Sequence, residues 1–151
     1  MQTLGLIMEI KKLETKDIKI VVDLWYKVSI VAHDFVSADY WRDNIENMTT
    51  IHLPKSENYV AIEEDEIIGF IAMLDGYLAA LFVDNKMQGK GVGKQLLNFI
   101  KEKRTSIQLS VYKKNTKSIG FYKSQGFDVK TEKTDDGTGE LELLMEWKKL
   151  S

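Results

Sequence analysis

Apolar residues in the first third of the chain recur at helical spacing. After a short strand over residues 6–11, Thr15 can accept the first amide hydrogen bonds of a helix as its cap. The inward positions of this helix are Ile18, Val21, Val22, Trp25, Val28 and Val31. Ser37 can cap a second helix, whose inward residues are Tyr40, Trp41, Ile45 and Met48. We predict a loop for residues 49–57.

The pattern then changes to the period that is typical of strands. Residues 59–63 and 67–74 predict two strands joined by the turn EEDE, and Asp75-Gly76 reverses the chain. The apolar run LAALFV, residues 78–83, predicts a fourth strand that is buried on both faces.

Helices and strands alternate in the remainder of the chain. A helix runs from about Gly91 to Thr105, SIQLSVY alternates as a fifth strand, and a helix from Thr116 to about Gln125 ends at Gly126. FDVKTE and ELELLMEW then form an antiparallel pair. The inward residues of the first of these helices are Leu96, Leu97 and Ile100.

The resulting order is β-α-α-β-β-β-α-β-α-β-β, which predicts an α/β fold with a mixed central sheet. No linker or repeat divides the sequence, so we expect a single domain over residues 1–151. Met8 can itself serve as the initiator. Residues 1–7 are then either a dispensable extension or a lengthening of the first strand.

Composition narrows the class of protein. The net charge is only -2, so no general field attracts nucleic acid or an anionic membrane, and we expect neither as a partner. The chain has no cysteine, which excludes disulfides, thiolate metal sites and a cysteine nucleophile, and fits a reducing compartment. No apolar run is long enough to cross a bilayer, and MQTLGLIMEIKK has its charges after the apolar stretch and none before it, which is not the pattern expected of a signal peptide. We therefore expect a cytoplasmic protein.

The stretch MQGKGVGKQLL, residues 87–97, lies between the fourth strand and the next helix. Unpaired amides at a helix N-terminus attract anions, and glycine lets an anion approach the main chain. Lys86, Lys90 and Lys94 add positive charge. The stretch predicts a phosphate or pyrophosphate site; the alternative is a tight turn in which the glycines serve only close packing.

Two common phosphate motifs do not fit. A dinucleotide fingerprint needs glycine at position 94, which is lysine, and a nucleotide P-loop needs glycine at position 88, which is glutamine. What remains is Gln88-x-x-Gly91-x-Gly93, which after a fourth strand resembles the signature of the GNAT superfamily of acyl-CoA-dependent N-acetyltransferases. NTKSIGFYKSQGF, residues 115–127, resembles the family's second block. The resemblance covers nearly the whole chain.

The resemblance implies a GNAT-like sheet that is splayed between strands four and five, with acetyl-CoA as cosubstrate and no metal. Pantetheine would lie beside Leu81, Phe82 and Val83, with the Phe82 or Val83 amide facing the thioester carbonyl. Asn115 would contact pantetheine from the other side, and Tyr122 would face the sulfur. The pyrophosphate would be held by the loop residues Gln88, Gly89, Lys90, Gly91, Val92, Gly93 and Lys94.

The expected reaction itself, apart from the family resemblance, indicates which groups the site needs. An amine that attacks a thioester creates an oxyanion, which a free strand N–H can stabilise, and a thiolate, which the Tyr122 hydroxyl can protonate. The alternative for Tyr122 is a core tyrosine beside Phe121. Without cysteine, we expect direct transfer in a ternary complex.

The sequence offers several candidates for the general base. Several family members place a glutamate at the start of strand four, where this chain has Tyr77. His33 in AHDFVS has a suitable intrinsic pKa, although Asp34 and Phe35 beside it also fit a helix cap and a core plug. Glu63 or a water molecule are alternatives. Two separated histidines, His33 and His52, predict no metal site.

We therefore expect an N-acetyltransferase that acts on a primary amine of a small molecule or peptide, as a monomer or homodimer. The alternative is a non-catalytic acyl-CoA-binding module. The motifs fit a small-molecule or a peptide acceptor, and either acetyl or a longer acyl group.

Overall fold

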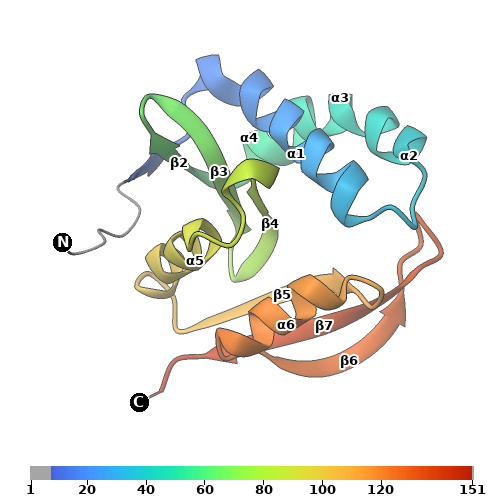
Figure 1. The fold of residues 1–151 in the computed structure, drawn as a ribbon. Coiled ribbons are helices and arrows are strands. Elements are labelled where there is room, and N and C mark those ends of the chain that lie inside the picture. The colour runs from blue at the N-terminus through green and yellow to red at the C-terminus, as the bar shows by residue number, and fades with distance from the viewer. Residues whose placement is uncertain (1–7, 151) are drawn as a thin grey trace.

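A seven-stranded mixed sheet forms the frame of the structure, a computed structural model that describes residues 8–150 (Figure 1). Neighbouring strands lie in the order β1-β2-β3-β4-β5-β7-β6, and only β4 and β5 pair in parallel. The strands are β1 (Glu9–Lys12), β2 (Glu57–Glu63), β3 (Glu66–Leu74), β4 (Tyr77–Val83), β5 (Ser106–Tyr112), β6 (Asp128–Thr134) and β7 (Leu141–Lys148). The predicted α/β class and mixed sheet are confirmed. The predictions for residues 1–7 lie outside the described residues.

The predicted splay between strands four and five is confirmed by the pairing register. β4 pairs with β3 along its whole length, from Leu74↔Tyr77 to Gly69↔Val83. Its pairing with β5 is confined to Tyr77↔Gln108. In Figure 1 the strands β5, β6 and β7 turn away from β4 and form a lower layer with α6. Among the residues that the structure describes, one edge of β4 therefore has no strand partner beyond Tyr77.

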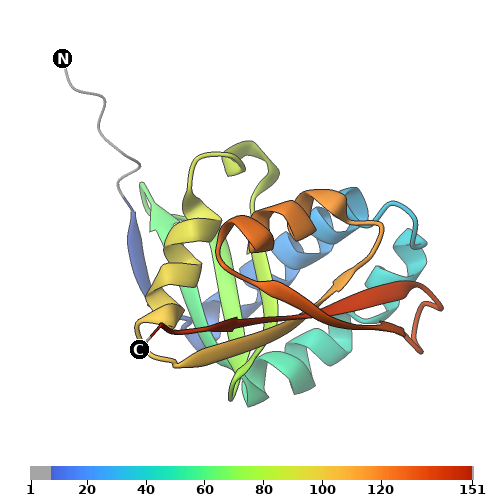
Figure 2. The same ribbon diagram turned by 90° about the horizontal axis from the view of Figure 1, so that it is seen from below.

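Helices cover the two faces of the sheet and enclose separate cores (Figures 1 and 2). One face carries α1 (Ile18–Ala32), α2 (Ala38–Asp43), α3 (Ile45–Asn47), the π-helix η2 (Met48–His52) and α4 (Leu53–Lys55). The other face carries α5 (Val92–Lys101) and α6 (Thr116–Ser124). Alternation in β3 supplies both cores, since Phe70 and Ala72 pack toward α1 whereas Ile71 and Met73 pack toward α5.

The prediction that the fourth strand is buried on both faces is wrong. Leu78 and Ala80 are buried, but Tyr77 and Ala79 are exposed, and residues 81–83 are half-buried. The cause is the departure of β5, which leaves one side of β4 open. The strand that is buried on both faces is β3.

Helix capping is partly as predicted. Ser37 caps α2, accepting a hydrogen bond from the Asp39 amide at 3.2 Å. Thr15 does not cap α1, because residues Thr15–Asp17 form a 3-10 turn (η1) and α1 begins at Ile18. Val31, predicted to point inward, is 61% exposed because it lies at the margin of the buried stripe of α1.

The predicted loop over residues 49–57 is also wrong. The chain stays helical through η2 and α4, and β2 begins at Glu57. Pro54 lies in the first turn of α4, where its missing N–H removes no helical hydrogen bond. The α5 helix ends at Lys101, four residues before the predicted end, whereas α6 stops as predicted before Gly126, which has a φ of +92°.

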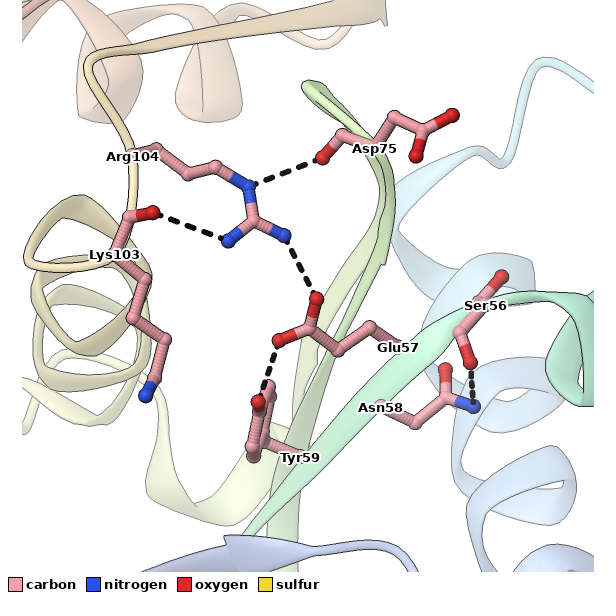
Figure 3. A network of polar contacts seen from close by, with 7 residues as sticks. All are labelled: Ser56, Glu57, Asn58, Tyr59, Asp75, Lys103 and Arg104. Carbon is pink, nitrogen blue, oxygen red and sulfur yellow. Dashed lines mark hydrogen bonds and ion pairs between the residues drawn. The ribbon is translucent and has the colours of Figure 1, made fainter.

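A polar network fixes the end at which β4 and β5 still pair (Figure 3). The Arg104 guanidinium donates to the Glu57 carboxylate at 2.8 Å and to the Asp75 carbonyl at 3.1 Å. The Tyr59 hydroxyl donates to the other Glu57 oxygen at 2.5 Å. Hydrogen bonds from Tyr59 and then Arg104 hold the pKa of Glu57 below its usual range, and burial raises the pKa of Tyr59 to about 12. The network joins the start of β2, the β3–β4 turn and the link from α5 to β5.

Candidate functional site

The glycine-rich loop leaves its main chain exposed at the start of α5. It follows the 3-10 turn η3 (Asn85–Met87). Gly89 and Gly91 have φ angles of +81° and +87°, and Gly91 is the N-cap of α5. Apart from the glycine itself and its two chain neighbours, no atom of residues 8–150 lies within 4 Å of the position that a Cβ would take at either glycine. The positive φ angles favour glycine at both positions, and the free space leaves the first amides of α5 beside an open cradle.

Gln88, Val92 and Gly93 of the same loop differ in their contacts. The Gln88 side chain donates to the Val83 carbonyl at 3.1 Å and accepts from Lys117 Nζ, also at 3.1 Å. It thus braces the end of β4 against the start of α6. Val92 is buried in the core, so only its backbone can face a ligand. A Cβ at Gly93 would make ordinary contacts, the nearest at 3.5 Å from Phe121.

Two N–H groups of β4 point toward its unpaired edge. We call the space between β4 and β5 beyond the Tyr77–Gln108 pair the opening. The Asp84 N–H donates to the Ile68 carbonyl of the β3 side at 2.8 Å. Successive N–H groups of a strand point to opposite edges, so the Phe82 N–H also faces β3. The N–H groups of Leu81 and Val83 then face the opening. Of the two amides expected to face a thioester, Phe82 is therefore excluded by the register, while Val83 is compatible with it.

Tyr122 projects from α6 into the core on the α5 side of the sheet. It is 9% exposed, and its ring lies edge-on to Phe121 and Phe127, with centroids 5.3 and 5.5 Å away. Burial raises the pKa of the Tyr122 hydroxyl, and the nearby Tyr77 adds a smaller effect. Tyr122 is therefore a neutral hydrogen-bond donor at any physiological pH.

Asn115 and His33 meet just after the end of β5, although 82 positions separate them in the sequence. Asn115 is the N-cap of α6, and its Oδ1 accepts from the Ser118 amide at 3.1 Å. Its Nδ2 lies 3.3 Å from Nε2 of His33. Burial lowers the pKa of His33 to about 4. The imidazole is therefore neutral near pH 7.

Aromatic rings enclose His33. Trp41 of α2 stacks on it at 5.1 Å between centroids, and Tyr112 of β5 meets it edge-on at 5.0 Å. The Tyr112 hydroxyl reaches the Asp135 carboxylate in the β6–β7 turn at 3.4 Å. Tyr112 was missed by our sequence interpretation. The signal was present, because Tyr112 alternates with the buried Leu109 and Val111 and so must face the α1 side of the sheet.

Several candidates are not brought together. Glu63 ends β2 and is two strands away from the open edge of β4. Asp75 lies in the β3–β4 turn, and His52 is exposed at the end of η2. Within residues 8–150 no group of three or more His, Asp or Glu side chains is arranged to hold a metal ion. No helix in this range has the length and apolar character needed to cross a membrane.

Comparisons with known proteins identify the family. The family model of the acetyltransferase (GNAT) domain matches residues 54–129, the segment that contains β4, the glycine loop and α6. Peptidyl-lysine N-acetyltransferase YiaC of Escherichia coli K12 is 31% identical over 139 residues, which are 91% of this chain and 95% of that protein. Peptidyl-lysine N-acetyltransferase YjaB of the same strain is 33% identical over 109 residues, which are 72% of this chain and 74% of that protein.

Solved structures agree with the fold. The solution structure of apo-form YjaB from Escherichia coli has a TM-score of 0.84 and is 26% identical, covering 96% of this chain and 100% of that one. PaiA N-acetyltransferase from Thermoplasma acidophilum, solved in complex with coenzyme A, has a TM-score of 0.78 at 21% identity, with 95% of this chain and 99% of that chain covered. At that identity the second likeness concerns the fold alone.

Proposed function

This chain belongs to the GNAT family of acetyltransferases, and from that premise we propose that it transfers the acetyl group of acetyl-CoA to the side-chain amine of a lysine in a peptide or protein. The choice of acceptor is supported by the names of YiaC and YjaB, both described as peptidyl-lysine N-acetyltransferases. When bound, acetyl-CoA supplies an activated acetyl thioester. The residues described above hold it, orient it and assist the transfer.

The glycine loop fits the coenzyme pyrophosphate. The amides of residues 89–94 hold the two phosphates, and the open cradle at Gly89 and Gly91 admits them to the main chain. Lys90 and Lys94 are exposed beside these amides and add positive charge. Gln88 acts through its bracing contacts with Val83 and Lys117.

The free N–H groups of Leu81 and Val83 hold the pantetheine arm and the acetyl group. The arm thereby forms strand-like hydrogen bonds with the edge of β4 that β5 leaves unpaired. One of the two amides donates to the acetyl oxygen, where negative charge grows as the amine attacks. Loss of one such donor typically slows a reaction by about 10²–10³-fold.

Tyr122 provides the proton for the departing sulfur, and the proton released by the acetylated nitrogen restores the Tyr122 hydroxyl through solvent. Its raised pKa keeps the hydroxyl protonated, so it is always available as a donor. General acid assistance of this kind typically contributes about 10²–10⁴-fold. The absence of cysteine supports direct attack by the amine over an acyl-cysteine enzyme.

His33 is a poor candidate for the base in this environment. A ring with a pKa of about 4 is a weak acceptor for the proton of a lysine ammonium, whose pKa is near ~10. Its Nε2 is also occupied by Asn115. We therefore give His33 no part in proton transfer and propose that the lysine ammonium loses its proton to bulk solvent before the neutral amine attacks.

The observation that carries the proposal is the open edge of β4 beside an unobstructed glycine loop. Its test is thiol release from acetyl-CoA with a peptide that contains one lysine and a blocked N-terminus. The control peptide has arginine in place of that lysine. We expect release only with the lysine peptide, and mass spectrometry should locate the acetyl group on it. Coenzyme binding without release, across a panel of peptides, would instead indicate a non-catalytic acyl-CoA-binding module.

A further inference from the structure

The side-chain amide of Asn115 is held at both ends. Its oxygen accepts from the Ser118 amide, and a nitrogen could not do so, because an amide NH₂ has no free lone pair to accept with. The capping bond therefore settles which end of the amide is oxygen. The NH₂ end then faces Nε2 of His33 at 3.3 Å.

This arrangement determines the state of the imidazole. Since Asn115 Nδ2 can only donate, His33 Nε2 must accept, and the single proton of the neutral ring lies on Nδ1. Trp41 stacks on the imidazole and Tyr112 meets it edge-on, and these two contacts fix the plane of the ring. Nδ1 itself is buried and has no partner among the described residues, so nothing there stabilises an imidazolium.

We propose that His33 is a positioning residue that holds the Asn115 amide for the pantetheine arm of acetyl-CoA. An amide NH₂ has two N–H donors, of which His33 takes one and leaves the other for a coenzyme carbonyl. This inference rests on the proposed function only in naming the ligand. It differs from the base role in that the ring holds a fixed tautomer and exchanges no proton during turnover.

The tautomer can be measured without coenzyme or activity. The chain has two histidines, and a His52→Gln variant assigns the spectrum, because His52 is exposed at the end of η2 and takes no part in the His33–Asn115 contact. Long-range ¹H–¹⁵N correlation on imidazole-labelled protein should show a bare Nε2 and a protonated Nδ1 at His33 between about pH 6 and pH 8. A proton on Nε2, or an imidazolium in this range, would overturn the proposal.

The effect on coenzyme affinity can be measured with two variants of similar size. His33→Gln places an amide oxygen near the position of Nε2 and can still accept from Asn115, whereas His33→Leu cannot. Calorimetry should show about a tenfold loss of CoA affinity in His33→Leu, because a buried donor is left without its partner, and most of that loss should be restored in His33→Gln. Equal affinity of His33→Leu and the wild type would refute the positioning role.

Kinetics separate this role from a base and from a purely structural one. We expect His33→Gln to keep the wild-type pH dependence of kcat/KM, and His33→Leu to raise KM for acetyl-CoA more than it lowers kcat. A pH profile that loses its acidic limb in His33→Gln would restore the base role and overturn the proposal. If wild-type protein fails to bind CoA, the proposed function fails, while the tautomer measurement still decides the His33–Asn115 contact.

Discussion

Tyr77 and Gln108 form the single parallel bridge between β4 and β5 within residues 8–150. The Gln108 amide donates to the carbonyl of Gly76 at 3.0 Å, directly beside this bridge. Beyond it the N–H groups of Leu81 and Val83 face an edge that none of the described strands covers. The bridge is therefore the closed end of the opening, and the glycine loop lies at its other end, after Val83.

The glycine loop gives the first prediction. Gly91→Ala places a Cβ in the open cradle and forces a left-handed conformation that costs about 1–2 kcal/mol. We expect CoA affinity, measured by calorimetry, to fall at least about tenfold, because the methyl group obstructs the approach of the pyrophosphate to the amides.

Gly139→Ala is the matched control for backbone strain. Gly139 also has a positive φ of +75° with free space around its Cβ position, but it lies in the β6–β7 turn. It should lose similar stability and keep its CoA affinity. Equal affinity losses in both variants would show that strain, and not the cradle, governs binding.

Tyr122→Phe tests the proton donor. The ring stays packed against Phe121 and Phe127, so the free energy of unfolding and CoA affinity should change little. Thiol release with a lysine peptide should slow by about 10²-fold or more. Tyr26→Phe, on α1, is the control and should retain full activity. Unchanged turnover in Tyr122→Phe would leave Tyr122 with a packing role alone.

The local patterns anticipated most of the fold. Alternation and helical spacing predicted the strand and helix order, and Ser37 and Gly126 were correctly identified at helix ends. The loop predicted for residues 49–57 failed because Pro54 and its polar neighbours fit the first turn of a helix as well as a loop. Local sequence does not distinguish the two.

The site was predicted less completely for a different reason. Gln88 and Asn115 belong to motifs and could be named from the sequence. Contacts such as His33–Asn115 and Arg104–Glu57 join segments that are distant in the chain, so no spacing rule indicates them. The free amides of Leu81 and Val83 depend on the pairing register with β3, which composition alone does not define.

Stability should depend on pH through His33. Because its pKa is lowered to about 4, the unfolded chain binds a proton more readily, and the folded state loses stability as pH falls from the usual histidine pKa toward 4. Urea unfolding should show a loss of about 1.5–2 kcal/mol between about pH 7 and pH 5 from this group. The loss should be mostly absent in His33→Gln and retained in His52→Gln. The same pH dependence in all three proteins would contradict the buried, neutral state of His33.

Arg104 should stabilise the closed end of the opening. Arg104→Gln removes the ion pair with Glu57, which is partly exposed, and weakens the bond to the Asp75 carbonyl. We expect a loss of about 1–2 kcal/mol in urea unfolding near pH 7. Arg42→Gln, which breaks an exposed pair with Asp39 on α2, should cost less than about 0.5 kcal/mol. Comparable losses in the two variants would mean that the network of Figure 3 has no special weight.

A crystal structure of the complex with CoA is the most direct test of how this chain would hold its cosubstrate. It should show the pyrophosphate on the amides of residues 89–94 and the pantetheine arm hydrogen-bonded to the Leu81 or Val83 N–H beside Asn115. A pyrophosphate bound away from this loop, or an arm that leaves the open edge of β4 untouched, would contradict the account.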